Sequence, residues 1–284
     1  MTTRFDNHPA STTTSAVLTL LAMFLVFPVQ AGGQRSFQTE ASVTLSSECP
    51  VESESMSGPY QAAAELLCGL TDGGAFANMR ASAESRHGLL RSEAIVDSEG
   101  KFATASATSS FKDTITVNAP VAPGTVGTLD IRMPFSGQLL ANLSGTSNGV
   151  HLVEGSAHFD LQVRARMLNS GGDFSESRSA LRLVEEGVAG DEIGVLLLPI
   201  QFVFGEPIQL DVWLAAGASA VNCGPDCRVT ASSRYGRTAW MEGIQEVRLL
   251  DETPVADFEI TSDSGTDYTQ DQFDLLFRDS FLVD

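Results

Sequence analysis

Histidine, lysine and tryptophan are scarce in this sequence. Its 284 residues include four histidines, two tryptophans and two lysines, Lys101 and Lys112, and its 36 acidic residues outnumber the 17 basic ones. The formal net charge of −19 repels the phosphates of nucleic acids and the surface of anionic membranes. We therefore expect neither nucleic-acid binding nor electrostatic docking on a membrane.

Common catalytic motifs are also missing. The sequence contains no H-E-x-x-H and no P-loop. This favours a non-catalytic module with an adhesion, matrix or polysaccharide-binding role. The alternative from another class is a glycan-active hydrolase or lyase, in which carboxylates such as Glu154 and Asp160 would act as acid and base. A structural matrix protein that self-associates is a third hypothesis.

Long apolar runs are limited to one segment near the N-terminus. Residues 16–27 carry no charge, but as a helix they would span about 18 Å, whereas a bilayer core measures about 30 Å. Pro28 follows, and Val29 and Ala31 provide the small side chains that signal peptidase requires. We expect a signal peptide over residues 1–31 and export to the periplasm or the medium, with a retained N-terminal anchor as the alternative. No membrane span is expected after cleavage.

Four cysteines follow the expected cleavage site. In an oxidising compartment an even number of cysteines predicts disulfides, and the spacing favours Cys49 with Cys68 and Cys223 with Cys227. Three pairings remain possible. Cys223 and Cys227 enclose Gly-Pro-Asp, one residue more than a redox C-x-x-C motif, so a structural link is favoured over redox chemistry or zinc binding.

Alternating polar and apolar residues dominate the rest of the sequence. The clearest case is 158–168, and 75–84, 102–111 and 208–214 show the same period of two, which is typical of half-buried antiparallel strands. We predict an all-β fold, a single antiparallel β-sandwich of jelly-roll type with nine to eleven strands, over residues 32–268. One short helix is expected within 58–69, and residues 269–284 form an acidic C-terminal tail.

One polar strand face is the best candidate for ligand binding. Gln162, Arg164 and Arg166 alternate with apolar residues, and Trp213 and Trp240 are the two tryptophans that could lie near them. Arginine donates paired hydrogen bonds and indoles stack on the apolar faces of sugars, so this set would suit a polysaccharide. A solvated strand face and core indoles are the alternative.

Acidic residues accumulate near the C-terminus. Asp251, Asp257, Asp263 and Asp267 could supply oxygen ligands to calcium, although their spacing matches no EF-hand loop. Solubility of an exported chain is the alternative explanation for these charges. No other cofactor is expected.

Several segments are similar to those of a known group of exported proteins. These are A-S-A-T-S-S-F-K-D-T-I-T-V from Ala105, F-G-E-P from Phe204, and P-V-A-D-F with S-G-T-D-Y between Pro254 and Tyr268. Over residues 75–268 the chain resembles exported bacterial β-sandwich proteins that often carry a PEP-CTERM sorting signal. The resemblance implies a partner among extracellular polysaccharides or surface proteins, and no catalytic residues. After Tyr268 the sequence has no Pro-Glu-Pro motif, so we expect a soluble product.

Overall fold

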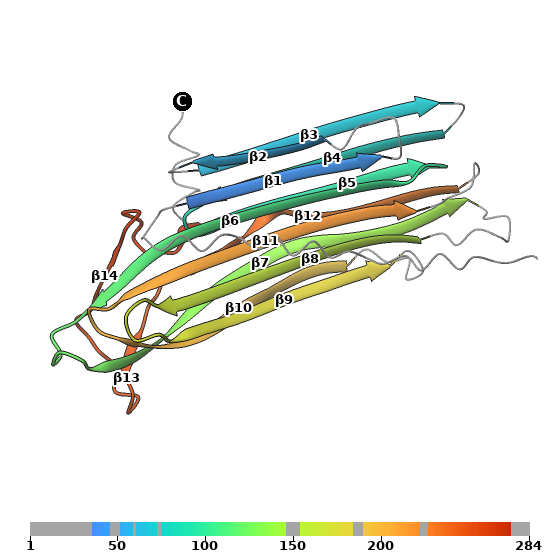
Figure 1. Cartoon of the computed structure of the whole chain (residues 1–284). Helices are drawn as coiled ribbons and strands as arrows, with labels where there is room; N and C mark the ends of the chain where they lie inside the picture. The colour runs from blue at the N-terminus through green and yellow to red at the C-terminus, as the bar shows by residue number, and fades with distance from the viewer. Residues whose placement is uncertain are drawn as a thin grey trace, which may run out of the picture. The chain divides into compact units, whose positions relative to one another are not determined.

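Two antiparallel sheets form the structure, a computed structural model that describes residues 36–45, 52–58, 61–72, 75–145, 154–183, 190–221 and 227–273 (Figure 1). Each sheet contains seven strands. Sheet A has the order β2-β1-β6-β11-β8-β9, with β14 beside β6, and sheet B has the order β10-β7-β12-β5-β4-β3, with β13 beside β7. In this part of the chain no helix is long and apolar enough to cross a bilayer.

The strands are long and follow one another with short connections. Those of sheet A are β1 (Ser36–Leu45), β2 (Glu52–Gly58), β6 (Ala103–Asn118), β8 (Glu154–Met167), β9 (Asp173–Leu183), β11 (Pro207–Val221) and β14 (Glu259–Ser262). Those of sheet B are β3 (Gln61–Asp72), β4 (Ala75–Arg86), β5 (Leu89–Glu99), β7 (Val126–Gly145), β10 (Gly190–Val203), β12 (Cys227–Trp240) and β13 (Val247–Leu249).

Strands β5 to β12 are connected as a jelly roll. The chain crosses between the sheets at each step except one, from β8 to β9, which are neighbours in sheet A. This path produces the order β10-β7-β12-β5 in one sheet and β6-β11-β8-β9 in the other, the two interleaved Greek keys of a jelly roll. The predicted fold class is therefore confirmed, and the remaining six labelled strands extend the two sheets.

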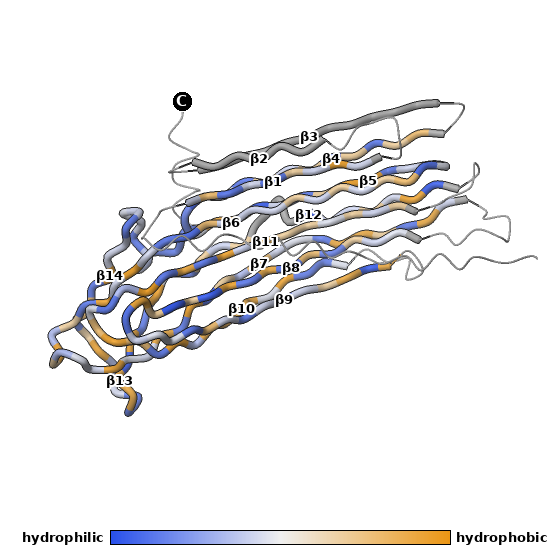
Figure 2. Tube along the Cα trace, viewed as in Figure 1, coloured by the Kyte–Doolittle hydropathy of each residue, from blue (hydrophilic) through white to orange (hydrophobic). Residues whose placement is uncertain are grey.

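The period of two in the sequence explains which side chains the sheets bury. Along β6 every second residue from Ala103 to Val117 is buried, and the residues between them are wholly or partly exposed. The same alternation of apolar and polar residues is visible along several strands in Figure 2. Because successive side chains point to opposite sides of a strand, each sheet has an inner face in the core and an outer face in water.

The core consists of two parts with different side chains. One part is built from large residues of both sheets, among them Phe111, Phe159 and Phe202. The other is built almost entirely from alanines, such as Ala107 and Ala218, with a few valines and Met79. Methyl groups fill less space than phenyl rings, so the sheets must approach each other more closely over the alanine part.

One strand corrects the helix expected within residues 58–69. Residues 61–72 form β3, which pairs with β4 without a register shift from Gln61↔Arg86 to Asp72↔Ala75. The helix-forming residues of this segment are overridden by pairing with a neighbouring strand, as tertiary context commonly does. The expected number of nine to eleven strands is also too low. Fourteen are present in the described residues, and two of them, β9 and the start of β10, lie within residues 169–192, where the sequence shows no clear alternation.

A buried carboxylate fastens the C-terminal part of the chain to the sandwich. Asp113 of β6 points inward and is 1% exposed. Its carboxylate accepts hydrogen bonds from the hydroxyl of Tyr268 at 2.8 Å, from the hydroxyl of Ser264, and from the backbone N–H groups of Ser264 at 3.1 Å and Thr114 at 2.8 Å. Four donors therefore compensate one buried charge, and Tyr268 is itself fully buried.

The F-G-E-P motif forms the turn between β10 and β11. Gly205 has φ of 79°, a backbone conformation that favours glycine, and its N–H donates to the carbonyl of Val117. Glu206 is only 6% exposed, and its carboxylate accepts a hydrogen bond from the N–H of Ser170 in the β8–β9 turn. The motif thus links the β10–β11 turn to the end of β6 and to the β8–β9 turn.

Candidate functional site

The outer face of sheet A brings together four of the residues that the sequence singled out. Gln162, Arg164 and Arg166 lie on the outer side of β8, since the residues between them are buried. Trp213 of β11 is opposite Gln162, and on its other side it is opposite Ser110 of β6. The half-buried indole therefore lies on a central strand between two polar side chains.

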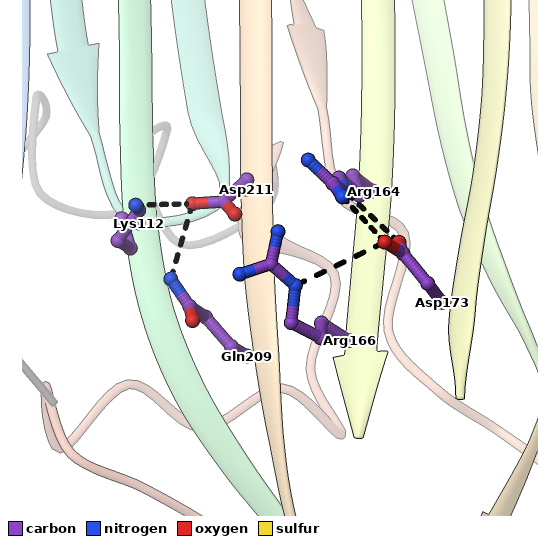
Figure 3. A network of polar contacts seen from close by, with 6 residues as sticks. All are labelled: Lys112, Arg164, Arg166, Asp173, Gln209 and Asp211. Carbon is purple, nitrogen blue, oxygen red and sulfur yellow. Dashed lines mark hydrogen bonds and ion pairs between the residues drawn. The ribbon is translucent and has the colours of Figure 1, made fainter. Parts of the chain in front are cut away.

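Charged residues next to Trp213 form a network across four strands (Figure 3). Arg164 makes a paired hydrogen bond to the carboxylate of Asp173 on β9, with Nε at 2.8 Å from Oδ1. Arg166 approaches the same carboxylate only to 3.9 Å. On the other side of β11, Nζ of Lys112 from β6 lies 3.0 Å from Oδ1 of Asp211. Three cations and two carboxylates thus share one end of this face, in a protein whose net charge is strongly negative.

The paired hydrogen bond determines the charge states of Arg164 and Asp173. Because Arg164 donates this hydrogen bond, the pKa of the Asp173 carboxyl is lowered and the pKa of the Arg164 guanidinium is raised. Both groups are therefore charged at neutral pH. Among the described residues Arg166 has only the long contact to Asp173, so its guanidinium retains more donors for a ligand.

Small residues follow Trp213 along the same side of β11. Ala215 and Gly217 are the next two outward positions, opposite Thr108 and Ser106 of β6. The distance from Trp213 to Gly217 along the strand is about 13 Å, which is longer than a single sugar ring. Beside the indole the sheet surface therefore consists of the Ala215 methyl group and short hydroxyl side chains, and Gly217 is buried.

A histidine covers the glycine in this row. His158 of β8 is opposite Gly217, and a Cβ built on Gly217 would lie 2.2 Å from Cε1 of the imidazole. Glycine thus allows the ring to lie flat on the strand, which is a typical reason for a glycine within a strand. Sequence analysis did not select His158 for this role, although a glycine within a run of alanines in an alternating strand was a usable signal.

His158 and its neighbour Asp160 have altered proton affinities. Loss of hydration around the imidazole lowers the pKa of His158, and the negative charge of Asp160 acts in the opposite direction. The same loss of hydration raises the pKa of Asp160, and the charge of His158 opposes that shift. For each group desolvation is the larger cause, so both neutral forms are favoured relative to free side chains.

Trp240 does not join this face. It lies at the end of β12 in sheet B, opposite Leu89, and its ring packs against Phe273 with the ring centroids 4.8 Å apart. The expectation that both tryptophans lie near the arginines is therefore wrong. Which sheet each tryptophan enters could not be predicted from the sequence alone, because it depends on how the connections cross between the two sheets.

Two of the four aspartates proposed as calcium ligands are used in separate local contacts. Asp251 accepts a hydrogen bond from the N–H of Thr253, and Asp267 accepts from the N–H and the hydroxyl of Thr269. Asp257 and Asp263 lie on either side of β14. Within the described ranges no three His, Cys, Asp or Glu side chains gather as they would around a metal ion. Calcium binding by these four residues remains a prediction.

Glu154 and Asp160, the carboxylates considered for acid and base catalysis, are both on β8. Six residues along a strand separate them by about 20 Å, whereas acid and base groups of glycosidases lie about 5–9 Å apart. This pair therefore does not form such a site.

The predicted disulfides stay predictions. Cys49 and Cys223 lie outside the described residues, and Cys68 and Cys227 are placed on β3 and β12.

The arrangement on sheet A is suited to binding an extended polar molecule. It offers an aromatic face, guanidinium and amide donors, and hydroxyl groups on a sheet whose strands are hydrogen-bonded to one another. Comparisons with known proteins supply no further guide, because no protein-family model, no curated protein and no solved structure matches the chain.

Proposed function

We propose that the protein is an exported, non-catalytic module that binds polysaccharide on the outer face of sheet A. The observation that carries the proposal is the position of Trp213, a half-buried indole on a central strand between Gln162 and Ser110 and beside a charged network. An indole in this position can stack on the apolar face of a sugar, while neighbouring amide and hydroxyl groups bond its hydroxyls.

The ligand that best fits this face carries carboxylate groups. The Arg166 side chain is 29% exposed and, within the part of the chain that the structure describes, makes only a 3.9 Å contact to Asp173, so its guanidinium can form paired hydrogen bonds to a uronate. Lys112 supplies a second cation from β6. The strong negative charge of the whole protein opposes a polyanion at long range, but screening limits this repulsion to about 8 Å at physiological salt.

Intrinsic fluorescence can test the proposal, because the chain has only two tryptophans. In a Trp240→Phe variant all indole emission comes from Trp213, and in a Trp213→Phe variant it comes from Trp240. We expect soluble hyaluronan, which alternates uronate and amino sugar, to change the emission of the first variant and not of the second. Dextran, a neutral glucan, serves as the control polymer.

Binding strength is measured by gel retardation in the same polymers. Trp213→Ala should weaken retardation by about fivefold, because a stacking contact contributes about 1 kcal/mol. Arg166→Gln should weaken binding to hyaluronan and leave any binding to dextran unchanged. Equal retardation of wild type and Trp213→Ala would contradict the proposal. Release of reducing ends from the polymer would instead favour a glycan-active enzyme.

A further inference from the structure

Strand β10 exposes a row of large apolar side chains on the outer face of sheet B. Ile193 is 76% exposed, Val195 49% and Leu197 45%. The residues between them point inward, and Pro134 of β7 lies opposite Val195 on the same outer face. A row of this kind on a sheet surface is a typical feature of an interaction site.

The same strand has an unpaired backbone edge. Among the described strands, β10 pairs with β7 alone, and this ladder continues through Pro199↔Asp130 without a register shift. A proline has no N–H to give to a ladder, so within an edge strand its nitrogen faces the free side. In an antiparallel strand every second residue directs its backbone groups to the same side. Counting back from Pro199, the residues Leu197, Val195 and Ile193 therefore direct their N–H and C=O groups to the free edge.

Between Ile193 and Leu198, β10 carries no charge, proline or bulge that would protect this edge. Natural edge strands avoid pairing with other chains through charged side chains, prolines or bulges. The edge strand of sheet A on this side, β9, carries Glu176, Arg178 and Arg182. In β10 the charges are confined to Asp191 and Glu192 at its start, and six uncharged residues follow from 193 to 198.

We propose that a second copy of this chain pairs with β10, strand against strand and antiparallel, about a two-fold axis at Val195. In this register Val195 is opposite the second copy's Val195, and Ile193 is opposite the second copy's Leu197. The three residues with free N–H and C=O groups then satisfy one another, and the three exposed side chains pack in one row.

The charges of the strand agree with this register. Asp191 is opposite the second copy's Pro199, and Glu192 is opposite its Leu198, so no acidic side chain faces another. A strand that pairs with itself would otherwise bring acidic residues together in a protein of net charge −19. The remaining repulsion is long-range and acts between whole copies, so salt screens it.

Sedimentation velocity of the purified, oxidised protein tests the association. We expect a monomer–dimer equilibrium whose dissociation constant is lower in 0.5 M than in 0.05 M sodium chloride. Val195→Lys places two like charges against each other at the axis and should abolish the dimer. Leu250→Lys is the matched control, because Leu250 is 54% exposed and lies outside β10, and it should dimerise like wild type.

Cysteine cross-linking tests the register. Opposed residues in a hydrogen-bonded pair have Cα atoms about 5.5 Å apart, within the range of a disulfide. Val195→Cys should therefore form a covalent dimer under mild oxidation. The two copies of residue 193 would be about 13 Å apart, so Ile193→Cys should not. A monomer at every salt concentration, a dimer that survives Val195→Lys, or equal cross-linking at both positions would overturn the proposal.

Discussion

Removing one oxygen atom tests how the C-terminal part of the chain is held. In Tyr268→Phe the ring stays in place, and only the hydroxyl that donates to Asp113 at 2.8 Å is lost. Tyr268 is fully buried and Asp113 is 1% exposed, so water cannot replace the missing donor without a local opening. The variant therefore isolates one hydrogen bond to a buried charge.

The expected loss follows from the partners of the carboxylate. A hydrogen bond to a charged group contributes about 1.5–3 kcal/mol, and no cavity is created because the ring volume is kept. Three of the four donors remain, from Ser264 and Thr114. We therefore expect Tyr268→Phe to lower the free energy of unfolding by about 2 kcal/mol.

Urea unfolding at pH 7 measures this loss, with the slope m checked for constancy between wild type and variant. Asp113→Asn and the double variant with Tyr268→Phe complete a double-mutant cycle, which reports the interaction between the two side chains. A loss below about 0.5 kcal/mol, or a coupling energy near zero, would refute the role assigned to this bond.

The contribution of Tyr268 to stability depends on pH, and the direction of this dependence follows from its pKa. Burial, and then the negative charge of Asp113, raises the pKa of the Tyr268 phenol well above its usual value near 10. A group with a raised pKa in the folded state contributes its stability fully below the pKa of the unfolded state and loses it as pH rises. The stability of wild type should therefore fall above pH 10 relative to Tyr268→Phe, which has no phenol to ionise. Parallel pH curves would contradict this explanation.

Four further predictions concern the core and the surface. Ala218→Leu should lower the free energy of unfolding by about 1–3 kcal/mol, because the larger side chain overpacks the alanine part of the core. Phe159→Ala should lower it by about 3–5 kcal/mol, because it leaves a cavity. Unfolding in urea measures both losses, and an Ala218→Leu variant as stable as wild type would contradict close contact of the sheets. Gly217→Ala should push the His158 ring away from the strand and raise its pKa toward 6.5, as an NMR titration of the imidazole would show, with an unchanged midpoint as the contrary result. Arg248→Ala should leave the urea midpoint unchanged, because this arginine and its partners are exposed.

The sequence predicted the fold class because its period of two is a local property. From 158 to 168 each side chain points to the side that the alternation assigned, and the same holds from 208 to 214. The prediction of a helix within 58–69 was wrong because the outcome there depends on a non-local property. Its alanines and leucines fit a helix locally, and only pairing of β3 with β4, which a single sequence does not reveal, decides the outcome.

Part of the candidate site was predictable and part was not. Gln162, Arg164 and Arg166 share a face because they are two residues apart on one strand. That Trp213 joins them and Trp240 does not depends on which sheet each strand enters, a property of the chain path through both sheets. The position of His158 on Gly217 depends in turn on the register of β8 against β11.

The contact between Asp113 and Tyr268 also limits when the protein can finish folding. The two residues are 155 positions apart, so a growing chain that has already produced β6 must add more than half its length before the carboxylate meets its donors. Until then β6 would have to bury this charge with only the N–H of Thr114 as a donor, and contacts of such long sequence separation form slowly. Incomplete chains should therefore remain unfolded and open to proteolysis, and stable structure should arise only once synthesis has passed Tyr268.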